Sequence, residues 1–340
     1  MTTKDKLLEE LDRLSIPEFR LPWSVSLSPY VDSAQEQTIQ WSKSHDLFPS
    51  EQIQSRAERT KYAWLAGRCY PNADREYLQL TADYFSWYFL ADDLFVDRVE
   101  LVTANTVPNL TARVDVLDFN EAGPEPVFGE SAWVDFCRRL RRRVSAEHFE
   151  RFANGMRLWD SVSALQILFH QHPASLREWD TIRRYASGMF PCLDLGDGVN
   201  ADAMTAEEFH DPDVQILRLH ANNYVCYTND IDGLAVEIRQ PGQSLNGALI
   251  YALECGSLQQ AVDYFARRVD REVDGFIRRA EMVEARSSER VRGYVEGLRS
   301  WMRGYREWAE VDSTRYSFAH AALDADDAAI GAVHAAGRRS

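Results

Sequence analysis

Hydrophobic residues along this chain recur at the spacing of an α-helix, and few segments show the strict alternation typical of a β-strand. Similar helical patterns run over 145–170, 213–238, 257–284 and 286–310. They predict an all-α protein with roughly ten helices. The clearest pattern lies in the stretch 74–96, whose apolar and aromatic positions include Tyr77, Leu78, Leu80, Tyr84, Phe85 and Tyr88.

Short stretches rich in proline, glycine and small polar residues separate these patterns, for example "HQHPAS" at 171–176 and "RQPGQS" at 239–244. No internal repeat and no linker divides the chain, so we expect one helical domain over 31–318. Residues 1–30 are predicted to form an extended N-terminal strap. The Ala-rich tail over 319–340 is expected to be disordered.

The amino-acid composition, and above all the net charge, limits which classes of partner this protein can bind. The chain has 340 residues, 45% of them hydrophobic, and its 53 acidic against 38 basic residues leave a formal net charge of −15. Such a charge argues against binding to nucleic acid or to an anionic membrane, and is compatible with a site that gathers divalent cations. The N-terminus is polar, no apolar run is long enough to span a bilayer, and the five cysteines form no CxxC pair. These features predict a soluble, cytoplasmic protein.

The segment "FLADDLFVD" at 89–97 places three carboxylates in an otherwise apolar stretch. On a helix, Asp93 and Asp97 share a face, and Asp92 lies about 100° from Asp93. Clustered carboxylates repel one another unless a cation neutralises them. Surface charge at a helix end is the simple alternative, but the aromatic residues that precede the segment tie this helix end to the core.

A second acidic stretch, "TNDIDGLAVE" at 228–237, carries Asn229, Gly233 and Glu237 at intervals of four residues, so they form one stripe along a helix. Asp230 flanks this stripe. An amide oxygen and a carboxylate are hard ligands that suit Mg2+. An exposed polar helix face remains the alternative for this stretch considered alone.

Two cationic segments complete the pattern. Arg183 and Arg184 lie on a predicted helix that should break near Gly188, and Arg315 and Tyr316 lie near the end of the predicted domain. Arginine is the preferred planar donor for phosphate oxygens. Two acidic helix faces that hold Mg2+, with arginine and tyrosine donors beside an aromatic cavity, would release diphosphate from an allylic carbon and stabilise the resulting carbocation.

At this point the chain resembles the bacterial class I terpene synthases, over nearly its whole length. "DDLFVD" is similar to the family's aspartate-rich motif, with the last acid one position later than usual. "NDIDGLAVE" is similar to its Asn-Asp-x-x-Ser-x-x-x-Glu motif, but Gly233 replaces the usual Ser or Thr, so that a water must supply that ligand or the metal is held more weakly. Val236 replaces a cation that often contacts diphosphate.

The resemblance implies an α-helical bundle with a central active-site cavity and a carbon–oxygen lyase that cyclises an isoprenyl diphosphate with three Mg2+ ions. The implied metal ligands are Asp92, Asp93, Asp97, Asn229, Gly233 and Glu237. The implied diphosphate donors are Arg183 or its neighbour Arg184, Arg315 and Tyr316. Catalysis would rest on Asp92, Arg183, Gly188, Arg315 and Tyr316, with Tyr88, Phe89, Ser187, Phe190 and Trp308 lining the cavity.

Several alternatives stay open. We expect farnesyl diphosphate as the substrate, but Ser187 and Gly188 facing inward would leave room for geranylgeranyl diphosphate, whereas Phe190 facing inward would suit the shorter chain. A chain-elongating or head-to-head isoprenyl synthase is disfavoured, because the second motif begins with Asn and ends with Glu. A helical binding protein that has lost catalysis is the non-enzymatic alternative. The protein would act as a monomer or a homodimer.

Overall fold

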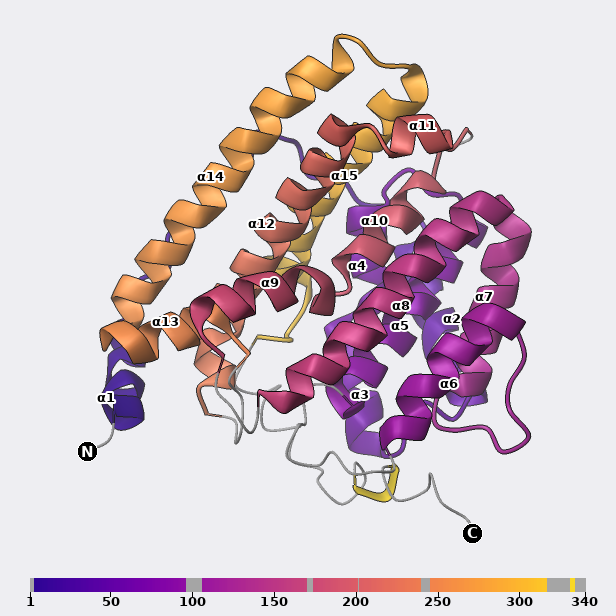
Figure 1. Cartoon of the computed structure of the whole chain (residues 1–340). Coiled ribbons are helices and arrows are strands. Elements are labelled where there is room, and N and C mark those ends of the chain that lie inside the picture. The colour runs from indigo at the N-terminus through magenta and orange to yellow at the C-terminus, as the bar shows by residue number, and fades with distance from the viewer. Residues whose placement is uncertain are drawn as a thin grey trace.

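The computed structural model describes residues 3–95, 106–169, 174–200, 202–239, 245–316 and 331–333. Within these ranges the chain forms fifteen α-helices and no β-strand, which confirms the predicted all-α class (Figure 1). None of the described helices is long and apolar enough to cross a membrane. The helices are α1 (Thr3–Glu10), α2 (Val31–Ser44), α3 (Glu51–Thr60), α4 (Tyr62–Cys69), α5 (Arg75–Phe95), α6 (Thr106–Phe119), α7 (Glu130–Arg143), α8 (Ala146–Leu168), α9 (Leu176–Ala186), α10 (Met189–Asp197), α11 (Ala206–Phe209), α12 (Pro212–Glu237), α13 (Gly247–Cys255), α14 (Leu258–Glu284) and α15 (Glu289–Glu307).

The long helices coincide with the five predicted patterns to within a few residues, and helix ends follow local chemistry. Ser175 and Glu178 form a reciprocal capping box at the start of α9, and Asp211 caps α12, whose first residue is Pro212. The estimate of about ten helices was too low. Helices of eight to ten residues, such as α3, α4 and α10, are shorter than the window over which a periodic pattern can be recognised.

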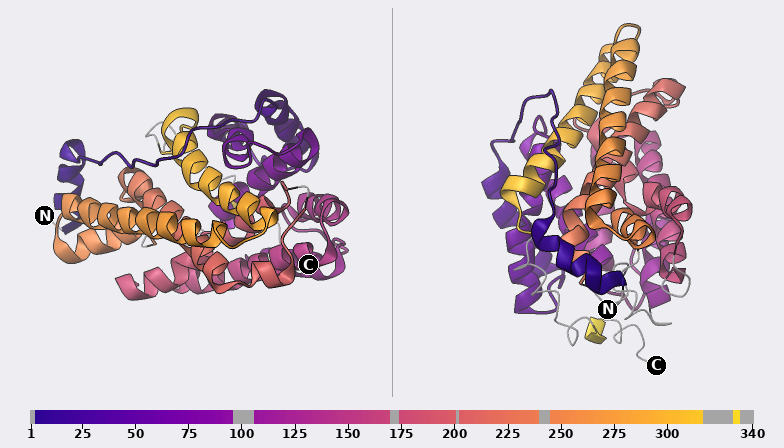
Figure 2. Two further views of the ribbon diagram at one scale, coloured as in Figure 1. Left: turned by 90° about the horizontal axis from the view of Figure 1, so that it is seen from above. Right: turned by 90° about the vertical axis from the view of Figure 1, so that its left-hand side faces the viewer.

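The N-terminal segment differs from the predicted extended strap. Its first part is helical, in α1 and a 3-10 turn at Leu11–Arg13, because Leu7 is buried against the bundle. The Glu10 carboxylate accepts a hydrogen bond from Leu258 N at 2.8 Å, which fixes α1 at the start of α14. Residues 14–30 then cross the molecule without regular structure to α2 (Figure 2). The predicted disorder of the tail 319–340 lies outside the described residues, apart from 331–333.

Helix α5 forms the centre of the core. Most of its side chains are buried on all sides, because α2, α4 and α7 pack around it. Trp87 of α5 stacks on Trp133 of α7 with ring centroids 4.1 Å apart, and Tyr84 contacts Phe136 at 5.1 Å. Aromatic packing of this kind holds the helix in one position and orientation. The same helix carries the first aspartate pair at its C-terminal end.

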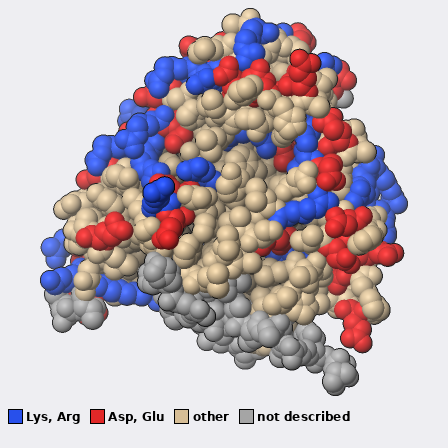
Figure 3. All heavy atoms as spheres, in the orientation of Figure 1, with Lys and Arg blue, Asp and Glu red and all other residues tan. Residues whose placement is uncertain are grey.

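Charged side chains are distributed rather than gathered on the face that Figure 3 shows. Lys and Arg alternate with Asp and Glu around a largely uncharged centre. The net charge of −15 therefore does not form a single acidic patch on this face.

Helices α4 and α15 approach each other closely at Gly304. A Cβ atom built there would overlap the carbonyl oxygen of Arg68 and lie 2.9 Å from the backbone nitrogen of Cys69. Backbone atoms cannot move aside as a side chain can, so this contact requires glycine. It also places Trp301 and Tyr305, which lie on α15, at a fixed distance from α4.

We expect Gly304→Ala to lower the free energy of unfolding by roughly 1–3 kcal/mol, because the added methyl group overpacks the α4–α15 contact. Gly297→Ala is the matched control on the same helix, where a Cβ would have no neighbour within 4 Å. That change should raise stability by about 0.5–1 kcal/mol through helix propensity. Denaturant unfolding of the two variants measures both effects, and equal stabilities would contradict the close approach.

Candidate active site

A cavity opens among α3, α4, α5, α8, α9, α10, α12 and α15, with about 1220 Å³ of empty space that includes open solvent at its mouth. Much of its wall is aromatic or apolar. Phe85 of α5 meets Trp301 of α15 edge to face at 5.9 Å, and Tyr88 meets Phe89 in the same way at 5.8 Å. Aromatic faces attract cations and exclude water, so this wall suits a carbocation.

The first aspartate pair faces this cavity. Asp92 and Asp93 both line it, and Asp93 is only 6% exposed. The carboxylate of Asp93 accepts hydrogen bonds from Arg56 Nη2 at 2.6 Å and Arg315 Nη2 at 2.8 Å. Two guanidinium groups therefore balance the buried charge of Asp93 in this state. The third predicted acid, Asp97, lies outside the described residues.

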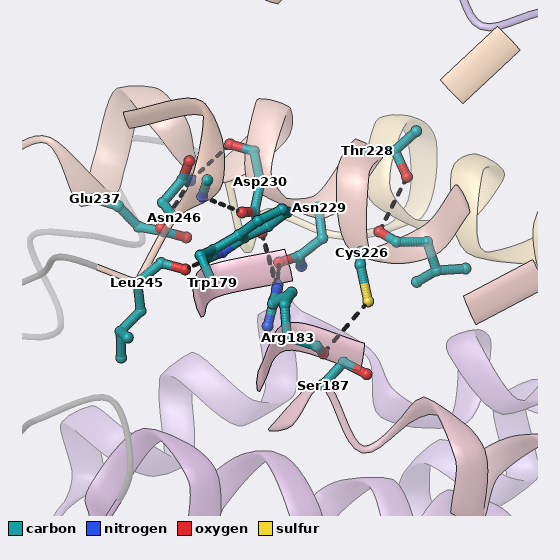
Figure 4. A network of polar contacts seen from close by, with 12 residues as sticks. Trp179, Arg183, Ser187, Cys226, Thr228, Asn229, Asp230, Glu237, Leu245 and Asn246 are labelled. Atoms are coloured by element: carbon teal, nitrogen blue, oxygen red, sulfur yellow. Dashed lines mark hydrogen bonds and ion pairs between the residues drawn. The ribbon is translucent and has the colours of Figure 1, made fainter. Parts of the chain in front are cut away.

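The second acidic stretch lies on α12 and also faces the cavity (Figure 4). The Asn229 amide is held from both sides, because its Oδ1 accepts from Arg183 Nη2 at 2.5 Å and its Nδ2 donates to Tyr316 Oη at 2.7 Å. Asp230 accepts from the same guanidinium at 2.8 Å and from the backbone nitrogen of Gly247 at 2.5 Å. The amide oxygen of Asn229 is thus positioned before any cation arrives.

Glu237 fills the space beside Gly233. A Cβ atom at Gly233 would overlap Glu237 Oε1 and lie 2.9 Å from its Cδ, while Glu237 Oε2 accepts from Asn246 Nδ2 at 2.9 Å. We had expected this glycine to leave room for a water ligand. Here the flexible end of Glu237 takes that room instead, so a serine at this position would require the carboxylate to swing away.

Arg183 and Arg184 are clearly distinguished. Arg183 lines the cavity and Arg184 does not, because the two side chains point about 100° apart on α9. Burial alone would lower the pKa of Arg183, but the carboxylate of Asp230 raises it above the ordinary value. Burial alone would likewise lower the pKa of Arg315, but the carboxylate of Asp93 raises it well above its usual range. Both guanidinium groups stay charged.

The helix break occurs at Gly188, as predicted. This residue separates α9 from α10 with a φ of 67°, in the left-handed region that favours glycine. Side chains engage two backbone carbonyls beside this break, since Ala186 O accepts from Trp159 Nε1 at 3.0 Å and Arg184 O accepts from Asn222 Nδ2 at 2.8 Å.

Two predicted cavity residues do not line it. The turn at Gly188 directs Met189 and Cys192, which are three positions apart on α10, into the cavity. Phe190 therefore points elsewhere, with its ring 5.6 Å from Tyr185 and 5.7 Å from the Arg218 guanidinium. Trp308 is fully buried behind the wall, where its Nε1 donates to Thr60 O at 2.9 Å and its ring supports Phe89 at 6.0 Å.

The other predicted wall residues, Tyr88, Phe89 and Ser187, do line the cavity. Ser187 facing inward with Phe190 facing outward is the arrangement expected to leave room for the longer substrate. Met189 and Trp301 add bulk to the same wall, so the break does not set the cavity size by itself.

Arg56 and Gln166 line the cavity but were missed from the sequence. Arg56 lies in the highly charged helix α3, where nothing in the pattern distinguishes it from surface arginines. Gln166 is one neutral polar residue in a long amphipathic helix. Only tertiary contacts bring these two side chains to the site, through the Arg56–Asp93 ion pair and the packing of α8 against α9 and α10. Within the described ranges, no three His, Cys, Asp or Glu side chains form a ready metal cluster.

We expect Gly188→Ala to lower the free energy of unfolding by roughly 1–3 kcal/mol and to displace Tyr88. A Cβ there would overlap the Tyr88 hydroxyl in addition to straining the backbone. Gly256→Ala is the matched control, because Gly256 has a similar φ of 78° with no atom within 4 Å of its Cβ position. Thermal unfolding of both variants separates steric overlap from backbone strain, and equal losses would show that Tyr88 does not press on Gly188.

Comparisons with known proteins agree with this geometry. The family model described as terpene synthase family 2, C-terminal metal binding, matches residues 83–275. A sesquiterpene synthase of Metarhizium brunneum is 51% identical over 99% of both chains. The (+)-corvol ether B synthase/(+)-corvol ether A synthase of Kitasatospora setae is 50% identical over 93% of this chain and 99% of its own. A crystal structure of an α-eudesmol synthase superposes with a TM-score of 0.75 at 23% identity, covering 86% of this chain and 98% of that one. The chain therefore belongs to the terpene synthase family and has its class I α-helical fold.

Proposed function

We propose that this protein is a Mg2+-dependent sesquiterpene cyclase that ionises farnesyl diphosphate and cyclises the carbocation. The observation that carries the proposal is the convergence of two oxygen-rich helix faces and three arginines on one aromatic cavity. The Kitasatospora relative is named as cyclizing (2E,6E)-farnesyl diphosphate, and the Metarhizium relative as a sesquiterpene synthase. At about half identity over nearly the whole chain, they support the same substrate here.

The side chains at the mouth fit a magnesium site. Asp92 and Asp93 from α5 and Glu237 from α12 offer carboxylate oxygens, and Asn229 from α12 offers an amide oxygen, which are the ligands that Mg2+ prefers. The family resemblance implies three such ions. When bound, they neutralise the diphosphate and draw electrons from the C–O bond that breaks. Asp97 remains a proposed ligand from the resemblance alone, and Gly233 contributes space rather than a ligand atom.

Three guanidinium groups and a phenol would bind the diphosphate. Arg183, Arg315 and Arg56 each bond a carboxylate or amide at the mouth, so all three are already placed where charge must be balanced. Tyr316 is oriented by hydrogen bonds to Asn229 and to Tyr305 Oη at 2.9 Å. Phosphate oxygens are strong acceptors for such donors. Arg56 would supply the cation that Val236 fails to provide on α12.

The cavity wall would then control the hydrocarbon chain. Phe85, Tyr88 and Trp301 line this wall, where aromatic rings would keep bulk water away from the developing charge and stabilise it. Geranylgeranyl diphosphate is the second candidate substrate, and the inward position of Ser187 favours it. A binding protein without catalysis is a poorer fit, because the buried arginines at the mouth would serve no reaction.

The direct test is incubation of the purified protein with Mg2+ and geranyl, farnesyl or geranylgeranyl diphosphate, followed by gas chromatography of extracted terpenoids. We expect cyclic fifteen-carbon products from farnesyl diphosphate, and none when EDTA is in excess. Undiminished turnover in EDTA would exclude the metal-dependent mechanism. Preferential conversion of geranylgeranyl diphosphate would replace the proposed substrate with the longer one.

We expect Arg183→Ala to lower kcat/KM for farnesyl diphosphate by roughly 10- to 100-fold, since losing a charge-assisted hydrogen bond costs ~1.5–3 kcal/mol. Arg184→Ala is the matched control, because its side chain lies outside the cavity wall. Steady-state kinetics of the two variants, with circular dichroism to check folding, measure the difference. If Arg184→Ala had the larger effect, the assignment of Arg183 as the diphosphate donor would be wrong.

A further inference from the structure

Gln166 is a neutral amide on α8 that lines the cavity. The residue is 7% exposed, so its side chain is more than nine-tenths buried. Within the described part of the chain, its amide group has no hydrogen-bond partner, and the amide atoms are open to the cavity rather than sealed inside the protein. The partner that this amide needs must therefore come from the cavity.

Two further polar side chains of α8 have buried atoms without a hydrogen-bond partner in the described part of the chain. Asp160 and Ser163 precede Gln166 by six and three residues, so the three lie on successive turns of neighbouring faces. Asp160 Oδ2 and Ser163 Oγ are both buried without a partner among the described residues. Asp160 Oδ1 accepts from Arg113 Nη1 at 3.4 Å. Incompletely bonded polar groups thus run along α8 from a buried ion pair to Gln166, and of the three only Gln166 lines the cavity.

Other polar groups of the cavity differ from Gln166 in this respect. Ser187 Oγ donates to Asn222 Oδ1 at 3.1 Å, and Cys226 Sγ to the same oxygen at 3.3 Å. Asn229 is held by Arg183 and Tyr316. These groups have protein partners, whereas Gln166 offers both a donor and an acceptor to the cavity itself. Water is the small ligand that both donates and accepts hydrogen bonds, so it matches an amide that offers both to the cavity.

We propose that Gln166 holds a water molecule that adds to the carbocation, so that the enzyme forms an oxygenated terpenoid. This inference rests on the proposed function. A lone pair of the water oxygen forms the new C–O bond to the cationic carbon, and the resulting oxonium loses one proton to the released diphosphate. No oxidant is needed. An amide suits this task because, unlike a carboxylate, it carries no charge that would itself capture the cation.

The test is product analysis in water enriched in oxygen-18, with Mg2+ and farnesyl diphosphate. For the wild-type protein we expect a terpenoid alcohol or ether that carries oxygen-18. Gln166→Leu should raise the ratio of hydrocarbon to oxygenated product roughly tenfold, as expected for the loss of one positioning hydrogen bond, while substrate is still consumed. Gln166→Met provides a second apolar variant of similar length should the leucine variant fold poorly.

Ser161→Ala is the control, since Ser161 lies on the exposed face of the same helix and its hydroxyl donates to Arg157 O. Its product ratio should equal that of the wild type. A crystal structure should show an ordered water bonded to the Gln166 amide and its loss in Gln166→Leu.

Unlabelled hydrocarbons as the sole wild-type products would overturn this inference and leave the proposed function standing. An unchanged product ratio in both Gln166 variants would do the same. Failure of the wild type to convert farnesyl diphosphate would overturn the proposed function first.

Discussion

Buried arginine–carboxylate pairing at the mouth of the cavity is the interaction on which the site depends. Asp93 lies between Arg56 and Arg315, and Asp230 accepts from Arg183. An isolated carboxylate in such an environment would be costly, so each acid requires its guanidinium. The pairs join α3, α5, α9, α12 and the segment after α15, which places ligands and donors from distant parts of the sequence around one opening.

The apolar core holds the mouth of the cavity in place, because helix α5 contributes side chains to the core and to the mouth. Its aromatic side chains pack against α7 and the cavity, and its last turns carry Asp92 and Asp93. The stacking of Trp87 on Trp133, less than two turns away on α5, therefore helps to fix the positions of the two aspartates. Gly188 has a similar double role, since its left-handed backbone ends α9 and its lack of a Cβ allows Tyr88 to approach closely. Packing and chemistry are coupled through these shared elements.

The cavity has a charged mouth and a mostly apolar wall. Oxygen ligands and guanidinium groups gather where α5 and α12 end, whereas Phe85, Met189 and Trp301 line the wall. A substrate with a diphosphate head and a hydrocarbon chain fits both parts at once. Gln166 differs from Ser187 and Cys226, the other polar groups of the wall, because its amide has no protein partner among the described residues, and this contrast makes it informative. A polar group in such a place is retained against a desolvation cost.

The sequence by itself determined the all-α class, the long helices, the two acidic stretches and the break at Gly188, because each depends on spacing within one segment. Only the tertiary structure decided between Arg183 and Arg184, moved Phe190 and Trp308 out of the wall, and brought Arg56 and Gln166 into it. These outcomes depend on the rotation of one helix relative to another, where an error of one residue turns a side chain by about 100°. Local periodicity carries no information about that rotation, because it is set by the packing of residues far apart in the chain.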